Sequence, residues 1–109
     1  MANKTIVKSV QKYLKYVKEQ GIPVSYGVLF RSYVKNEEHK WSDIDVLVVS
    51  PRFDEDQTVD DYEKLWMYAA RTNKLVEPIP VGEKQNQEDK TSLILDVARR
   101  EGQIIPLVE

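Results

Sequence analysis

The chain has 109 residues and carries 16 basic and 18 acidic side chains, which gives a formal net charge of −2. This length excludes a two-domain enzyme and a TIM barrel, and the balance of charge offers no basic footprint for binding a nucleic acid. The absence of cysteine excludes disulfides, thiolate catalysis and cysteine-based zinc sites.

The sequence predicts neither export nor membrane insertion. Residues 1–17 contain lysines throughout and lack the apolar core of a signal peptide. The longest purely apolar run, residues 46–49, is far too short to cross a bilayer. We therefore expect a cytoplasmic protein without a membrane partner.

The first half of the chain predicts one helix and two strands. Apolar side chains recur at helical spacing over residues 4–20, with lysines on the opposite, solvated face, and Gly21 ends the pattern. Residues 24–30 are β-branched and aromatic, which is typical of a strand. Residues 43–50 are apolar on both faces, which indicates a central strand that is covered on both sides, and Pro51 ends it.

The next segment predicts an acidic loop, a helix and a third strand. The loop covers residues 53–57, and Thr58 is a candidate N-cap for the helix that follows. Five side chains are expected to share the buried face of this helix: Tyr62, Leu65, Trp66, Ala69 and Ala70. Residues 74–81 predict a strand, and its two prolines place it near a sheet edge.

The last segment predicts a polar loop over residues 82–90, a short helix over residues 92–100 that Gly102 ends, and a strand over residues 104–108. This last strand either completes the sheet or pairs across a homodimer. The order of elements indicates one α+β domain over residues 1–109, in which helices pack on a mixed β-sheet as a two-layer α/β structure.

The residues that carry chemistry stand at the start of the second strand, in Ser42-Asp43-Ile44-Asp45. Alternate residues of a strand project from the same face, so Asp43 and Asp45 are expected side by side while Ile44 points into the core. Their Cα atoms are expected about 6.5–7 Å apart, since a strand rises about 3.3 Å per residue. Two carboxylates at this spacing can bind one divalent cation, and Mg²⁺ prefers oxygen ligands.

A structural role is the alternative, because Ser42-Asp43 alone is also typical of a turn or a cap. Asp45 is harder to explain in that way. Aspartate is depleted in strands, and burying an unpaired carboxylate is costly. A bound cation removes this cost, which favours a metal site. A Mg²⁺ ion on two carboxylates keeps positions for substrate phosphates, and the backbone amides and Ser32 hydroxyl after the first strand could bind phosphate oxygens.

The sequence around Ser32 and Asp43-Ile44-Asp45 resembles the minimal nucleotidyltransferase (MNT) family of the DNA polymerase β-like superfamily. That family has Gly-Ser, ten residues and then Asp-x-Asp, and here ten residues separate Ser32 from Asp43. The resemblance covers residues 24–50 strongly and extends more loosely to the third strand. It implies the nucleotidyltransferase fold.

The resemblance also implies a third carboxylate on a neighbouring strand, and Glu77 stands at the matching position. The alternative for Glu77 is a solvated side chain of an edge strand. By resemblance, Asp43 and Asp45 bridge Mg²⁺ ions, one of which carries the triphosphate, while Glu77 helps the other to lower the pKa of the attacking hydroxyl. The expected reaction is in-line attack on the α-phosphate of a nucleoside triphosphate, with pyrophosphate leaving.

The chain departs from the family pattern at Arg31, which replaces the glycine before the serine. By resemblance, that glycine lets the backbone approach the phosphates closely. Arginine either crowds the nucleotide and impairs catalysis with the fold intact, or binds phosphate oxygens through its guanidinium. Asn36 also replaces a family glycine, but asparagine tolerates left-handed conformations.

Three further residues give weaker indications of a functional role. Lys35 matches a basic position of the family's turn, where it either binds phosphate or is solvated. His39 is more typical of a surface histidine than of a metal ligand. Trp41 is more typical of a side chain covering the sheet edge than of one stacking on a base.

These residues predict a Mg²⁺-dependent nucleotidyltransferase that transfers a nucleoside monophosphate, AMP from ATP, to a hydroxyl of a protein or a small molecule. The resemblance implies a HEPN-domain partner, since stand-alone MNT domains often act as the antitoxin of a helical HEPN toxin and transfer AMP to it. The alternative, because of Arg31, is a catalytically impaired binding module or antitoxin with the same fold. The chain is too short for a glycosyltransferase that uses Asp-x-Asp.

Overall fold

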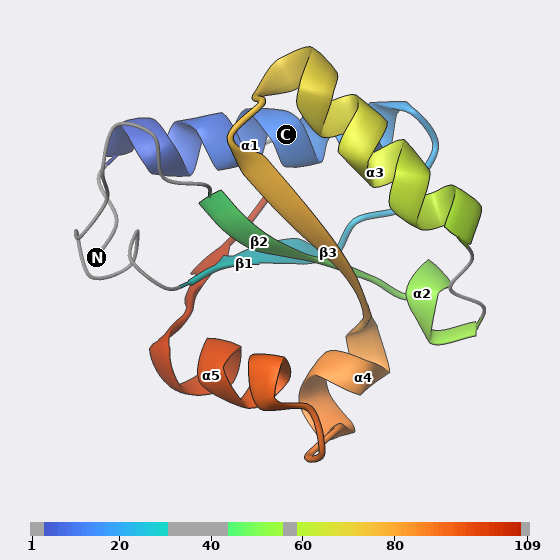
Figure 1. Ribbon diagram of the computed structural model, residues 1–109, viewed down its shortest axis with the longest axis vertical. Coiled ribbons are helices and arrows are strands. Elements are labelled where there is room, and N and C mark those ends of the chain that lie inside the picture. Colours follow the sequence, from blue (N-terminus) through green and yellow to red (C-terminus); the bar gives the residue numbers. More distant parts are fainter. Residues whose placement is uncertain (1–3, 31–43, 56–58, 108–109) are drawn as a thin grey trace.

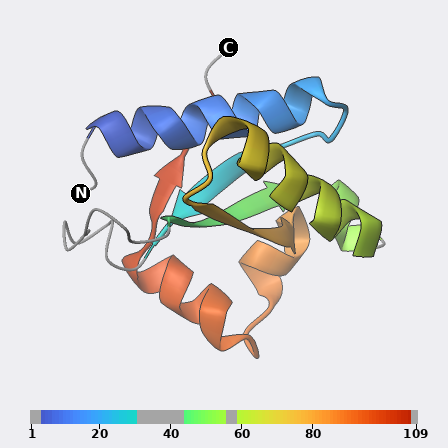
Figure 2. The same cartoon turned by 45° about the horizontal axis from the view of Figure 1, so that its top comes forward.

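The computed structural model of the protein describes residues 4–30, 44–55 and 59–107. A mixed sheet with the strand order β3-β2-β1-β4 lies between layers of helices (Figures 1 and 2). Its strands are β1 Tyr26–Leu29, β2 Ile44–Ser50, β3 Val76–Gly82 and β4 Gln103–Ile105. The central pair is β1 and β2, which are antiparallel; β3 adds to β2 in parallel, and β4 adds to β1 in antiparallel orientation.

The described residues form five helices, which are α1 Lys4–Glu19, α2 Arg52–Glu55, α3 Val59–Thr72, α4 Glu83–Glu88 and α5 Leu93–Glu101. Helices α1 and α3 cover one face of the sheet, and α4 and α5 lie on the other (Figure 2). The predicted mixed sheet with helices packed on it is confirmed, and the structure adds that the helices lie on both faces. No helix in the described residues is long and apolar enough to span a membrane.

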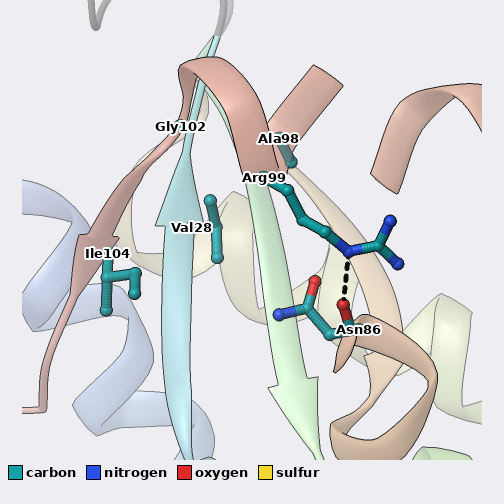
Figure 3. A pocket seen from close by; sticks show the side chains of 6 residues that line it. All are labelled: Val28, Asn86, Ala98, Arg99, Gly102 and Ile104. Carbon is teal, nitrogen blue, oxygen red and sulfur yellow. Dashed lines mark hydrogen bonds between the residues drawn. The ribbon is translucent and has the colours of Figure 1, made fainter. Parts of the chain in front are cut away.

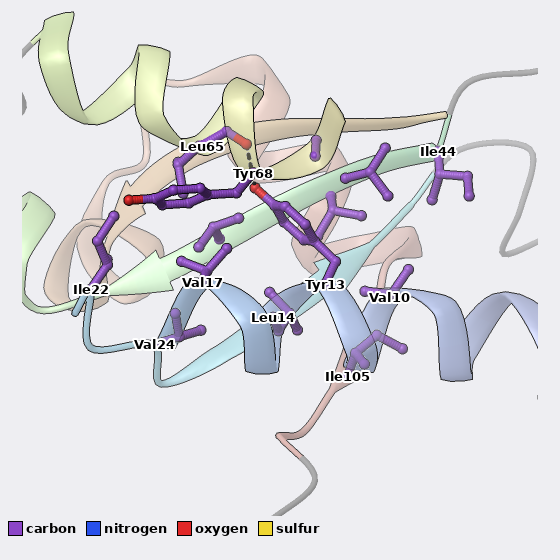
Figure 4. Packing of buried hydrophobic residues seen from close by; sticks show 14 of the residues in the cluster. Val10, Tyr13, Leu14, Val17, Ile22, Val24, Ile44, Leu65, Tyr68 and Ile105 are labelled. Atoms are coloured by element: carbon purple, nitrogen blue, oxygen red, sulfur yellow. Dashed lines mark hydrogen bonds between the residues drawn. The ribbon is translucent and has the colours of Figure 1, made fainter. Parts of the chain in front are cut away.

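The larger core lies between the sheet and helices α1 and α3 (Figure 4). It takes alternate residues of β2 and one stripe from each helix: Ile44, Val46, Val48, Val10, Tyr13, Leu14, Val17, Leu65, Tyr68 and Ala69. Within it, the Tyr13 hydroxyl donates a hydrogen bond of 2.9 Å to the Leu65 carbonyl and joins the two helices. Gly27 lets α1 approach β1 closely, since a Cβ there would lie 2.7 Å from Leu14 Cδ1.

The smaller core lies between the other face of the sheet and α5. It takes the remaining alternate residues of the central strands together with one side of the helix: Val28, Phe30, Leu47, Val49, Val81, Leu95 and Ala98. Every residue of β2 is therefore buried. The prediction of a central strand that is covered on both sides is confirmed.

Two segments predicted as loops are helical. Helix α2 replaces the start of the predicted acidic loop, because Phe53 is buried in the larger core. Helix α4 lies within the predicted polar loop and buries none of its side chains, so no apolar period in the sequence marks it. Its first turn is capped from α2: the Asp54 carboxylate accepts hydrogen bonds from the N–H groups of Lys84 at 2.9 Å and Gln85 at 3.1 Å.

The predicted buried face of α3 is partly wrong. Leu65 and Ala69 are buried as expected, but Tyr62, Trp66 and Ala70 are exposed, and Tyr68 takes a place in the core instead. Apolar residues lie on both sides of this helix, so its sequence period did not decide which side packs on the sheet.

The remaining elements agree with the sequence predictions apart from small changes at their ends. Strand β3 is an edge strand, as its prolines predicted. Ser92 caps α5 by accepting a hydrogen bond from the Leu95 N–H, and Gly102 ends that helix. Strand β4 pairs with β1 and so completes the sheet of its own chain. The predicted N-cap of α3, Thr58, lies outside the described residues.

Candidate active site

Asp45 lies near the start of β2, on the face of the sheet that carries the smaller core. Its neighbours Ile44 and Val46 point into the larger core, whereas Leu47, two residues on, belongs to the smaller one. The Asp45 side chain is only 9% exposed although it is ionisable. The predicted alternation, with Ile44 in the core and Asp45 on the opposite face, is confirmed.

Glu77 stands directly opposite Asp45 in the parallel ladder between β2 and β3. It projects to the same face, because Ile79 and Val81, two and four residues further along β3, pack with the smaller core. Neighbouring strands lie about 4.8 Å apart, so the two acidic side chains are neighbours on the sheet surface. Glu77 is half-buried.

The two side chains offer carboxylate oxygens on one face of the sheet. An all-oxygen donor set is the one that Mg²⁺ prefers. Asp45 and Glu77 therefore fit a hard cation. The described part of the chain contains no group of three His, Cys, Asp or Glu side chains placed to hold a metal, and Asp43, the third predicted ligand, lies outside it.

The predicted phosphate-binding residues Arg31, Ser32 and Lys35 also lie outside the described residues, as do Asn36, His39, Trp41 and Ser42. The last described residue before them is Phe30, which is fully buried in the smaller core. Its N–H donates a hydrogen bond of 3.4 Å to the carbonyl of Asp45. The chain therefore leaves β1 beside Asp45 immediately before the segment that contains Ser32.

A pocket of about 210 Å³ lies on the same face of the sheet, between β1, β4, α4 and α5 (Figure 3). It is lined by Val28, Asn86, Ala98, Arg99, Gly102 and Ile104. Arg99 Nε donates a hydrogen bond of 2.8 Å to the backbone carbonyl of Asn86. The side-chain amide of Asn86 donates one of 2.8 Å to the Tyr26 hydroxyl. Asn86 stood in a predicted loop and no motif marks Asn86 or Arg99, so the sequence does not indicate this pocket.

A sequence model of the nucleotidyltransferase domain matches residues 10–101 of this chain. The chain belongs to the nucleotidyltransferase domain family. The match includes β2 and β3 and therefore both Asp45 and Glu77. The nucleotidyltransferase identity predicted from the sequence is confirmed. In a comparison with curated protein sequences, no relative matches.

Solved structures of toxin–antitoxin proteins share the fold of this nucleotidyltransferase domain. A toxin–antitoxin structure with AMP-PNP has a TM-score of 0.61 at 20% identity, over 94% of this chain and 74% of that chain. The toxin–antitoxin mutant MntA-HpeT has a TM-score of 0.59 at 17% identity, over 90% and 73%. A tri-AMPylated Shewanella oneidensis HEPN toxin in complex with MNT antitoxin has a TM-score of 0.55 at 16% identity, over 92% and 71%.

Proposed function

We propose that this domain transfers AMP from ATP to a hydroxyl group in a Mg²⁺-dependent reaction. The observation that carries this proposal is the pairing in register of Asp45 and Glu77 on one face of the sheet. Family membership supports it, since nucleotidyltransferases generally use a nucleoside triphosphate and a divalent metal. One similar structure contains AMP-PNP, and another has two aspartates, spaced like Asp43 and Asp45, replaced by glutamate.

A bound Mg²⁺ would neutralise charge on the phosphate oxygens and lower the pKa of the attacking hydroxyl. Asp45 and Glu77 would hold it through carboxylate oxygens, together with Asp43, which precedes β2 by one residue and shares the alternation of Asp45 in the sequence. Ser32 and Lys35 would donate hydrogen bonds to phosphate oxygens and so orient the triphosphate.

In the proposed reaction the acceptor oxygen forms a bond to the α-phosphorus of ATP. The bond from that phosphorus to the bridging oxygen breaks, pyrophosphate leaves with the electron pair, and the hydroxyl proton is lost. The chain contributes mainly position and charge, because its carboxylates and phosphate-binding groups fix the reacting atoms in line before the reaction begins.

We propose a HEPN-domain protein as the partner that supplies the hydroxyl. Three similar structures support this partner. One is a toxin–antitoxin structure with AMP-PNP, one is a toxin–antitoxin mutant, and one is a tri-AMPylated HEPN toxin in complex with an MNT antitoxin. Since the proposed donor is ATP, we expect the reaction to take place in the cytoplasm.

Arg31 favours a second candidate function, a binding module with this fold but without turnover. A side chain at the position of the family's glycine reduces the room for phosphates next to the backbone. Calorimetry separates the two candidates, because a nucleotide that cannot enter the site releases no heat on titration.

The test is titration of Mg-ATP into the wild-type chain, an Asp43→Asn/Asp45→Asn variant and an Arg31→Gly variant. Wild-type binding that the double variant abolishes supports an active site. Binding that appears only in Arg31→Gly supports the module without turnover. The control is Asp60→Asn/Asp96→Asn, which removes the same charge from two exposed helical aspartates and is expected to leave binding unchanged. Absence of binding in both the wild type and Arg31→Gly contradicts nucleotide binding altogether.

A further inference from the structure

The outer side of α3 carries an apolar patch that no element of the described structure covers. Tyr62, Trp66 and Met67 are 46%, 38% and 43% exposed. Tyr62, Trp66 and the exposed Ala70 lie on successive turns, and Met67 lies next to Trp66; these four residues are here called the α3 patch. The rings of Tyr62 and Trp66 contact each other edge to face, with centroids 6.2 Å apart.

The α3 patch lies on the part of the helix surface that the sheet does not cover. Leu65, Tyr68 and Ala69 pack in the larger core, whereas the patch residues stay exposed. Since α3 covers the face of the sheet opposite to Asp45 and Glu77 (Figure 1), the patch and the candidate active site lie on different sides of the molecule. A partner bound to the patch would leave the candidate active site open.

Glu63 and Arg71 are exposed charges of opposite sign on α3. Asp60 pairs with Lys64 of the same helix at 3.1 Å, so Glu63 supplies the acidic charge in the first half of α3, whereas Arg71 lies in its last turn. If two copies of α3 pack antiparallel, Glu63 of one helix faces Arg71 of the other. Parallel packing would instead bring like charges together. The patch is therefore complementary to itself in an antiparallel arrangement.

We propose that the α3 patch is the interface of a homodimer, in which the α3 helices of two copies pack antiparallel about a two-fold axis. In such an interface the same surface of each copy meets its own counterpart. Tyrosine, tryptophan and methionine are enriched in interface cores, with charged residues at the rim, and tryptophan and tyrosine frequently dominate the binding energy. The α3 patch has this composition.

The first test is sedimentation analysis of the full chain over a series of concentrations, in which the wild type is expected to form a dimer. Trp66→Glu is expected to sediment at the mass of one chain, 12.7 kDa. Leu93→Glu on α5 is the matched control, because Leu93 is 83% exposed yet lies outside the patch, and it is expected to remain dimeric. Circular dichroism checks that both variants fold. If Trp66→Glu does not fold, Met67→Glu takes its place.

A wild-type chain that stays monomeric at every concentration overturns the proposal, and so does a folded patch variant that remains dimeric.

The antiparallel arrangement has its own test. Glu63→Arg and Arg71→Glu are each expected to raise the dimer dissociation constant by about tenfold or more. The double variant Glu63→Arg/Arg71→Glu is expected to restore most of the loss, because opposite charges again face each other across the axis. A double variant that is weaker than either single variant overturns the antiparallel arrangement.

Discussion

Glu77, a proposed metal ligand, lies beside Asp45 on the same face of the sheet. Glu77→Gln keeps the size of the side chain and removes its charge. We expect this variant to weaken the apparent affinity for Mg²⁺ at least tenfold, within the roughly 10- to 100-fold range seen when such sites are perturbed, with little change in thermal unfolding. Magnesium titrations of nucleotide binding measure the change.

Glu55→Gln is the control for this prediction, since Glu55 is an exposed acidic residue of α2. Equal magnesium dependence in Glu77→Gln and the wild type would contradict the assigned role of Glu77.

The pairing of Asp45 with Glu77 could be anticipated from strand alternation and from the family motif. The pocket between α4 and α5 could not, because no motif marks Asn86 or Arg99.

The hydroxyl of Tyr13 has a defined hydrogen-bond partner in the larger core. Burial raises the pKa of this phenol above its usual value, and the nearby Tyr68 adds to the shift, so the hydroxyl stays protonated and donates to Leu65. Tyr13→Phe removes this hydrogen bond and is expected to lower the free energy of unfolding by about 1 kcal/mol. Urea denaturation measures the loss. Tyr16→Phe is the control, because the Tyr16 hydroxyl only accepts a long, exposed hydrogen bond from Arg71 and is expected to contribute little.

At the scale of elements, α4 depends on a residue from α2. Hydrogen bonds from backbone N–H groups of α4 hold the pKa of Asp54 below its usual value, and the N–H of Lys84 has the largest effect. A carboxyl with a lower pKa in the folded state contributes stability above its unfolded pKa of about 3.9, and this contribution is lost as the pH falls through the folded value. Asp54→Ala is therefore expected to lower stability at neutral pH and to weaken the loss of stability in acid.

Urea midpoints at neutral and acidic pH measure this effect. Asp60→Ala is the control, since Asp60 forms only an exposed pair with Lys64 within one helix. If Asp54→Ala and the wild type lose stability equally on acidification, the cap does not carry the pH dependence.

Gly82 makes the same contact possible, because a Cβ at this position would collide with the Asp54 carboxylate. Gly82→Ala is expected to cost about 1–3 kcal/mol in the wild type. The cost is expected to be smaller in an Asp54→Ala background, where the colliding oxygens are gone. Thermal or urea unfolding of the four proteins of this cycle gives the coupling, and equal costs in both backgrounds would show that the two residues act independently.

The elements that the sequence predicted best have a distinct apolar pattern, which is helical spacing in α1 and a continuous apolar run in β2. Helices α2 and α4 escaped prediction because α2 is only one turn long and α4 buries nothing, and both are held by contacts with distant residues. The buried side of α3 was misjudged for a different reason. Its second apolar side, with Trp66, competes with the true core side, with Leu65, and only the tertiary structure decides between them.

At the scale of the whole molecule, the central strands join the two cores, since successive residues of β2 point to opposite faces. Leu14→Ala in the larger core and Leu47→Ala in the smaller one are each expected to cost about 2–5 kcal/mol. Both variants are expected to unfold in a single transition, because neither core can melt without disturbing the strand that they share. Urea unfolding followed by circular dichroism and by fluorescence tests this, and transitions that separate between the two probes would show that the cores unfold independently.

The two edge strands, β3 and β4, influence how readily this molecule pairs with strands of other chains in a crowded solution. Strand β3 keeps its parallel pairing with β2 although Pro78 and Pro80 donate no N–H, so its donors to β2 come from the residues between and beside the prolines. The prolines therefore occupy the positions that would otherwise offer donors to an incoming chain. Strand β4, at the other margin, is three residues long and is followed by Pro106. Prolines and short length therefore make both margins poor templates for further strands, which disfavours edge-to-edge aggregation.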